Sequence, residues 1–154
     1  MPITPPAVGE VWEGQGGTYG GIMPARHGAK AYHIVFAEEI GQFAWGPYDQ
    51  NAPEASLVDG LLNTQALTAE EGLYPAAEAA AAYQADGHSD FYLPATAELS
   101  EVCLNIGNHP WPWVWSSTQR SSFLAFTMGV ESGTQGLNDK DALLGVRPFR
   151  RVPI

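Results

Sequence analysis

Alternating apolar and polar residues near the start of the chain predict a half-buried strand at residues 8–13. The apolar stretches 31–37 and 41–46 predict two further strands, so this part of the chain is expected to form a β-meander. Between the first two strands, residues 14–21 contain five glycines, which predicts a tight and irregular turn. A phosphate-binding loop is not favoured there, because the glycine spacing and the Gly-Lys-Ser/Thr sequence of such loops are missing.

The middle of the chain predicts two helices. Pro75 suits a first helical turn and precedes the alanine-rich stretch 76–83, so a helix is expected that ends near Asp86. Thr96 is expected to cap a second helix that Gly107 ends. The apolar stripe of this second helix, at spacings of three and four residues, consists of Leu99, Val102, Cys103 and Ile106.

The last third of the chain returns to strand-like segments, at residues 113–118, 123–128 and 146–152. Turns are expected at Ser132-Gly133 and at residues 138–141. The order of strands, two helices and strands predicts an α+β domain whose chain ends can pair in one sheet.

Two stretches lie outside this pattern. Residues 1–7 are proline-rich and are expected to form an extended N-terminal arm, which leaves 8–154 as a single domain. For residues 50–73 two interpretations stay open. Residues 54–62 are compatible with a helical turn, whereas Gly60 and the polar residues after it favour an irregular excursion.

Charge narrows the classes of partner. The 154 residues carry a net charge of −10, which repels nucleic-acid phosphates and anionic lipid head groups. Arg26 and Lys30 are the only basic residues before position 120, where the chain already holds 14 acidic residues. No apolar run is long enough for a membrane span, and no signal-peptide pattern is found at the start. We therefore expect a protein made in the cytoplasm that binds neither nucleic acid nor membranes.

The residues that could carry chemistry are isolated. Ser116 and Ser117 lie in a strand-like segment rather than in a nucleophile elbow. Cys103 could pair with His88 or His109 as a nucleophile, but its place on the apolar stripe favours a buried core residue. The four histidines lack zinc-ligand spacing, and the Asn138–Asp141 turn lacks a full calcium loop. We expect no metal, no cofactor and no catalytic residues.

Aromatic and polar residues gather in one segment. In a strand, Trp111, Trp113 and Trp115 would share one face, which is either a core face or an exposed platform. A core position is favoured for Trp115, and both positions stay open for Trp111 and Trp113. Neighbouring amide and guanidinium groups could make directional contacts with a glycan or a protein. The candidate ligand-binding residues are Asn108, His109, Trp111, Trp113, Gln119 and Arg120.

Four sequence motifs in order resemble one known family. They are Asp-Phe-Tyr-Leu-Pro-Ala-Thr-Ala-Glu-Leu at 90–99, Trp-Ser-Ser-Thr at 115–118, Ala-Phe at 125–126 and Val-Arg-Pro-Phe-Arg at 146–150. With this order, residues 8–152 resemble the Lcl C-terminal domain family, which has a C-type-lectin-like fold. Members of that family occur in bacterial surface adhesins and in phage and prophage tail-fibre proteins.

The resemblance implies a binding domain with variable loops on a rigid base, rather than an enzyme. The Glu-Pro-Asn and Trp-Asn-Asp triplets of calcium-dependent sugar-binding lectins are absent from the sequence, as are the paired cysteines of formylglycine-generating enzymes. By resemblance, the motif residues serve architecture. Leu93 and Leu99 are expected in the core, Trp115 under the sheet, and Arg147 beside an acid such as Glu98.

We therefore expect a receptor-binding module of a phage or prophage tail fibre, located in the virion, which recognises a bacterial surface glycan or protein. Such modules are usually homo-oligomers and often trimers, because several weak sites then act together. The alternative is a structural or assembly component that contacts other tail proteins and has no host ligand. A third class, an enzyme acting on surface polysaccharide, would need two carboxylates. The available ones are Glu38, Glu39, Asp86 and Asp90.

Overall fold

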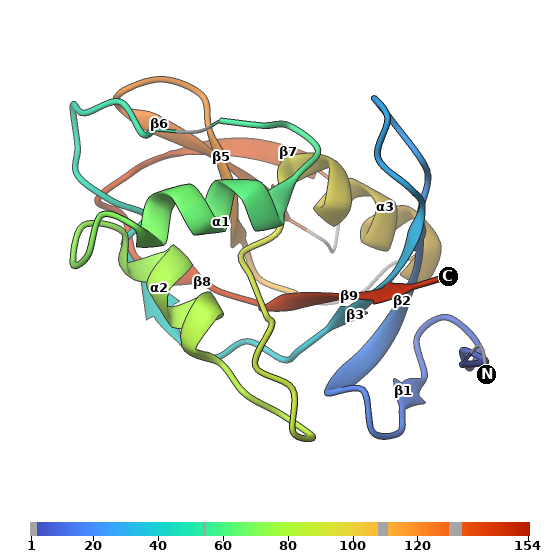
Figure 1. The fold of residues 1–154 in the computed structure, drawn as a ribbon. Helices are drawn as coiled ribbons and strands as arrows, with labels where there is room; N and C mark the ends of the chain where they lie inside the picture. Colours follow the sequence, from blue (N-terminus) through green and yellow to red (C-terminus); the bar gives the residue numbers. More distant parts are fainter. Residues whose placement is uncertain (1–2, 54, 108–110, 130–133) are drawn as a thin grey trace.

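The computed structural model describes residues 3–53, 55–107, 111–129 and 134–154. Within these residues the chain forms an α+β arrangement of three helices and two β-sheets (Figure 1). The predicted α+β class is therefore confirmed. The expectation of a single sheet with two helices is wrong, because a second sheet and a third helix are present. Asn108, His109 and the predicted turn at Ser132-Gly133 lie outside the described residues.

The first sheet joins both ends of the chain, as predicted. Its strands lie in the order β1-β2-β3-β9, and each neighbouring pair is antiparallel. The strands are β1 (Val11–Trp12), β2 (Gly17–Met23), β3 (Tyr32–Phe36) and β9 (Phe149–Pro153). Because β9 pairs with β3, the last strand of the chain lies beside one from its first quarter.

The second sheet is mixed, with the strand order β4-β8-β5-β6-β7. Only β5 and β8 run parallel, and the other neighbours are antiparallel. The strands are β4 (Gln42–Phe43), β8 (Leu144–Gly145), β5 (Val114–Gln119), β6 (Leu124–Gly129) and β7 (Thr134–Asp139). Two of these strands, β7 and β8, were not predicted from the hydrophobic pattern.

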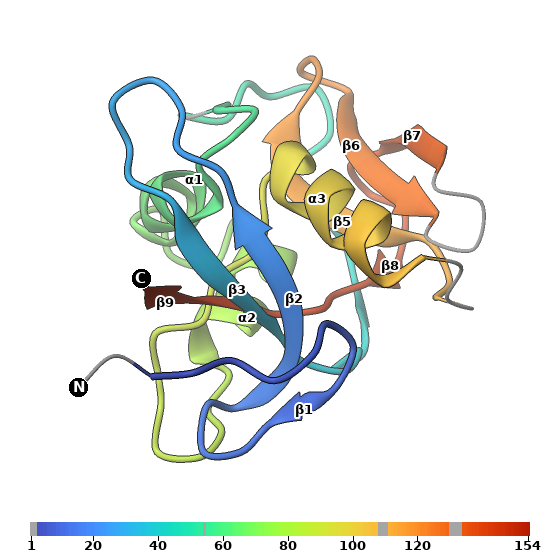
Figure 2. The same cartoon turned by 90° about the vertical axis from the view of Figure 1, so that its right-hand side faces the viewer.

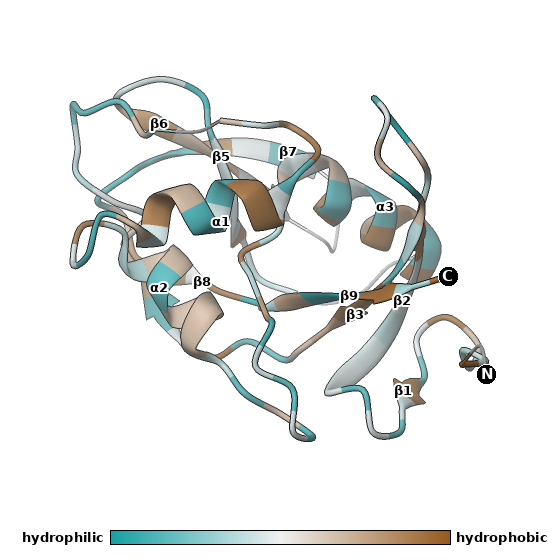
Figure 3. Ribbon diagram, in the orientation of Figure 1, coloured by the Kyte–Doolittle hydropathy of each residue, from teal (hydrophilic) through white to brown (hydrophobic). Residues whose placement is uncertain are grey.

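Helices α1 (Gly60–Thr68), α2 (Pro75–Ala82) and α3 (Thr96–Ile106) follow one another in the chain between β4 and β5, two strands of the second sheet. Helix α1 lies in the stretch that the pattern left open, and the carboxylate of Asp59 caps it by accepting a hydrogen bond from the Leu62 backbone N–H. The cap residue of α3 is Ala95 rather than Thr96. Each helix carries hydrophobic and hydrophilic residues side by side (Figure 3).

The glycine-rich segment expected to be a turn is largely strand β2, and the glycines allow close packing. A Cβ at Gly20 would lie 2.9 Å from Cγ2 of Val102, and a Cβ at Gly21 would lie against the Asn105 side chain. Helix α3 therefore packs directly on β2, as Figure 2 shows. Gly20 and Gly21 lack side chains because α3 occupies that space, a reason that a local pattern does not reveal.

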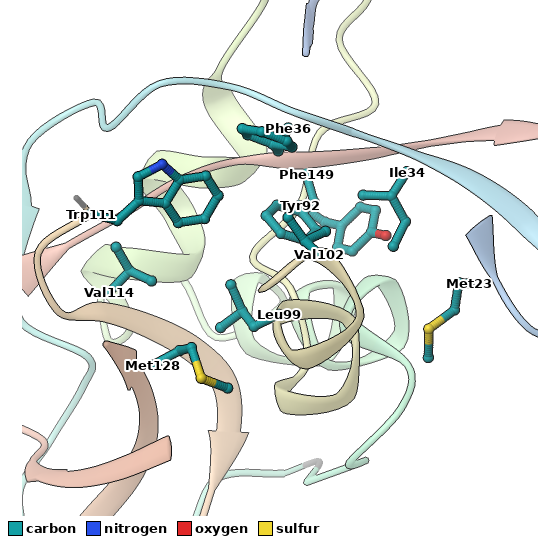
Figure 4. Packing of buried hydrophobic residues seen from close by; sticks show 10 residues of the cluster. All are labelled: Met23, Ile34, Phe36, Tyr92, Leu99, Val102, Trp111, Val114, Met128 and Phe149. Atoms are coloured by element: carbon teal, nitrogen blue, oxygen red, sulfur yellow. The ribbon is translucent and has the colours of Figure 1, made fainter. Parts of the chain in front are cut away.

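The main core lies between the two sheets and α3, and Figure 4 shows its buried side chains. Trp111 is one of them, packed against Phe36 with 5.0 Å between ring centroids. A second core under α1 and α2 contains Trp115 and Leu93. Leu93, Leu99 and Trp115 are fully buried, as the resemblance implied. Within the described part of the chain, no helix is both long and apolar enough to cross a membrane.

Candidate functional site

A hairpin links β2 to β3 and projects beyond the sheet (Figure 2). Two backbone hydrogen bonds between Arg26 and Ala29 close it, at 3.2 and 2.8 Å. Its two tip residues, His27 and Gly28, have φ values of 50° and 82°. Both lie in the left-handed region that a type I′ turn requires, and this turn matches the twist of paired strands. The hairpin thus holds its basic side chains over the neighbouring surface.

A cavity of about 200 Å³ lies under this hairpin, and we call it the hairpin cavity. Its polar lining comes from four separate segments: the hairpin, β3, the start of α1 and β9. These polar lining residues include Arg26, His27, Lys30, Tyr32, Asp59 and Arg151. The cavity therefore depends on tertiary contacts between residues as far apart as position 26 and position 151.

A second, more open hollow of about 590 Å³ continues from it along α3, and we call it the helix groove. The two spaces share Arg26, His27 and Val58. Ser100 and Glu101 of α3 form one wall of the groove, and Phe126 and Gln135 contribute from the second sheet. The exposed side chain of Leu57 adds apolar surface. Because they share lining residues, the two hollows adjoin, and we call them together the recess, which has both polar and apolar walls.

Arg26 crosses the boundary between the two spaces. Its Nη2 donates a 3.0 Å hydrogen bond to Oε1 of Glu101, which links the hairpin to α3. Nη1 of the same guanidinium lies 3.6 Å from the sulfur of Met23. Side chains of Arg26 and Glu101 are both partly exposed, so solvent or a ligand can reach this ion pair.

Arg151 forms the floor of the hairpin cavity and is held from several sides. Its guanidinium carbon lies 4.3 Å from the ring centroid of Tyr32 and 5.1 Å from that of Tyr92. Nη2 donates a 2.8 Å hydrogen bond to Asp59, and Nε donates a 3.1 Å bond to the Tyr92 hydroxyl. A guanidinium fixed in this way loses little side-chain entropy when a ligand arrives.

The fully buried carboxylate of Glu98 supports this floor from below. Its Oε1 accepts from the backbone N–H groups of Gly60 and Ala95, at the starts of α1 and α3. Its Oε2 accepts a 2.7 Å bond from the Tyr32 hydroxyl and a further bond from Tyr92. Burial raises the pKa of Glu98, while Arg151 and the hydrogen-bond donors oppose that rise. Burial and the nearby Glu98 carboxylate raise the pKa of Tyr32.

The pairing of Glu98 with Arg147 that the resemblance suggested is wrong. The cation beside Glu98 is Arg151, with Nη2 at 3.7 Å from Oε2. Arg147 instead lies over the Trp111 ring, with 4.0 Å between the guanidinium carbon and the ring centroid. Arg147, Arg150 and Arg151 lie within five positions of the sequence, so the sequence alone does not indicate which of them pairs with Glu98.

The sequence-predicted ligand residues fall at two ends of β5. Trp111 and Trp113 precede the strand, whereas Gln119 ends it and Arg120 follows it. Trp111 is buried at 7% exposure, while 41% of Trp113 is exposed. Only Trp115 of the three tryptophans lies in the strand, so a strand face shared by all three does not form. Arg120 is exposed and lies at the opposite end of β5 from Trp111 and Trp113.

Two of the carboxylates considered for polysaccharide cleavage have structural contacts. Asp86 accepts a 2.9 Å hydrogen bond from the Gly16 backbone N–H. Asp90 pairs with Arg150 at 2.6 Å. Among the described residues, no group of three or more histidine, cysteine or acidic side chains could hold a metal ion.

The residues of the recess are not among the sequence-predicted ligand residues, although the sequence contains some signals for them. Arg26 and Lys30 stand out as the only bases in a long acidic stretch. His27-Gly28, between two apolar segments, is compatible with a two-residue hairpin turn. Nothing local indicated that Arg151 joins them, because that contact depends on β9 pairing with β3.

The comparisons with known proteins add no identification. No family model matches the chain, and no curated protein matches it.

Proposed function

We propose that this chain is a C-type-lectin-like, receptor-binding module of a phage or prophage tail fibre that recognises a bacterial surface glycan or protein. The observation that carries the proposal is the recess formed by the adjoining hairpin cavity and helix groove. The four ordered motifs support the family, and the α+β arrangement with paired chain ends is compatible with it.

The chemistry of the recess favours recognition. Fixed donors and acceptors, such as Arg151 and Asp59, lie near apolar surface from Leu57 and Phe126. Saccharides and peptides both present polar groups next to apolar faces, and a preorganised site binds them at a lower entropic cost. A homo-oligomer, for example a trimer, would bring several such sites to one cell surface.

The test is binding of labelled, purified protein to a panel of bacterial strains. Ser100→Trp places a large side chain in the helix groove and should abolish saturable, strain-specific binding. Leu104→Trp is the matched control, because Leu104 lies one turn further along α3, is 78% exposed and is not part of the recess. Equal binding by both variants would contradict a site in the groove.

A third variant separates the recess from the sequence-predicted site. Trp113→Ala combined with Arg120→Gln changes two exposed candidate residues outside the recess. We expect this double variant to bind cells normally. Loss of binding here, with Ser100→Trp unaffected, would move the site to the tryptophan segment.

The alternative function is a structural component of the tail without a host ligand. Strand β7 favours it, because β7 is an edge strand of the second sheet and most of its side chains are exposed. Exposed strand edges can pair with another chain. A stoichiometric complex with another tail protein, together with no binding to any strain, would support this alternative.

A further inference from the structure

We infer that the hairpin cavity binds an anionic group of the surface ligand, either a sugar carboxylate or a phosphate. This inference rests on the proposed receptor-binding function and specifies the chemistry of its site. The chain has a net charge of −10, yet three of its seven lysine and arginine residues line this one cavity. They are Arg26, Lys30 and Arg151, and they face a single lining carboxylate, Asp59.

The local charge differs from that of the rest of the chain even when the neighbouring carboxylates are counted. Glu98 lies below the floor near Arg151, and Glu101 pairs with Arg26. The cavity and its surroundings therefore contain three cations and three carboxylates, with His27 as an additional donor at the rim. In a chain with a net charge of −10, such a locally neutral site would repel an anion less than the rest of the surface does.

The three cations have different roles. Arg151 is fixed by Asp59 and two tyrosine rings, which suits a rigid donor at the base of the cavity. Lys30 is exposed on the hairpin, where its ammonium can swing toward a bound anion. Arg26 is shared with Glu101, so an incoming anion would compete with that carboxylate for the guanidinium.

This competition gives a test that poor folding cannot imitate. Glu101→Gln removes the rival carboxylate and should strengthen anion binding by about threefold, because the Arg26 guanidinium then leaves no ion pair when it binds the anion. Lys30→Gln should weaken binding by about fivefold, because it removes a cation that pairs with the bound anion. Arg120→Gln removes an exposed charge outside the cavity and should leave anion binding unchanged.

The experiment is a chemical-shift titration of the ¹⁵N-labelled full chain with three probes. Trigalacturonic acid offers sugar carboxylates, glycerol phosphate offers a phosphate, and galactotriose is the neutral counterpart. We expect one of the two anions to bind more tightly than galactotriose and to shift the His27 and Gly28 amide signals. Raising NaCl from about 50 to about 500 mM should weaken that binding.

The anionic probe that binds more tightly shows whether the site prefers a carboxylate or a phosphate. Binding of galactotriose equal to that of both anions would overturn the inference, as would weaker anion binding by Glu101→Gln. The same variants are then tested on bacterial cells. Cell binding that Lys30→Gln and Glu101→Gln leave unchanged would overturn the anion site and keep the receptor function. Anion binding by a protein that binds no bacterial strain would support the anion site and overturn the receptor function.

Discussion

The ammonium of Lys140 donates a 2.9 Å hydrogen bond to Oε1 of Gln119. The same ammonium donates a 2.6 Å bond to the Gln50 carbonyl and lies 4.9 Å from the centroid of the Trp45 ring. Because the Gln119 oxygen also accepts from the Ala52 N–H, this pair fastens residues 50–52 to the end of β5. Gln119, a candidate ligand residue by sequence, thus has a structural role.

Lys140 makes stability depend on pH. Burial lowers its pKa from 10.5 to about 8. Between these two values the unfolded chain holds a proton that the folded protein releases, so the free energy of unfolding rises with pH. We expect a gain of about 1 kcal/mol from pH 8 to pH 9 that Lys140→Met lacks, measured by urea unfolding.

Lys30→Met controls for the loss of one positive charge at an exposed position. The comparison uses the difference between each variant and the wild type at every pH, which cancels groups common to all three proteins. Parallel curves for wild type and Lys140→Met would show that Lys140 is not the titrating group.

Glu98→Ala should be strongly destabilising. The Glu98 carboxylate accepts hydrogen bonds from two buried backbone N–H groups and two tyrosine hydroxyls. Without this carboxylate, these four donors lose an acceptor and Arg151 loses a nearby negative charge. We expect the free energy of unfolding to fall by roughly 3–5 kcal/mol. The control Glu101→Ala, on the next turn of α3, should cost about 1 kcal/mol or less. Similar losses for both variants would contradict a central role for Glu98.

The close packing of α3 on β2 predicts coupling between Gly20 and Val102. Gly20→Ala forces a methyl group against Cγ2 of Val102 and should cost about 1–3 kcal/mol. Val102→Ala creates space at that point, so the double variant should lose about 1 kcal/mol less than the sum of the single losses. Simple additivity in chemical denaturation would show that the two residues do not share this contact.

Cys103 should be nearly inert in the folded protein. It is half-buried beside the main core, and burial raises its pKa to about 11. Thiolate is the reactive form, so alkylation by iodoacetamide at about pH 8 should be roughly 100-fold slower than in urea. Mass spectrometry would measure both rates. A Cys103→Ser/Leu104→Cys variant moves the thiol to an exposed neighbour and should react rapidly in the folded state.

Much of the fold could be predicted because its strands and helices carry local signals. The stripe of Leu99 and Val102 marked α3, and the proline and alanine residues marked α2, which begins at Pro75 as predicted. Helix α1 gave a weaker signal: its cap, Asp59, is followed directly by a glycine. That glycine is needed because a Cβ at Gly60 would lie 2.5 Å from the Ala95 backbone nitrogen.

By itself, the sequence determined the α+β class, the order of most elements and the acidic character of the chain, since periodicity and composition are local or additive properties. The tertiary structure alone decided that Trp111 lies in the core while Trp113 is largely exposed. It also decided that Arg151 reaches Asp59 across 92 positions. Such contacts arise when β9 pairs with β3 and α3 packs on β2, so their partners are set by how distant segments meet in space.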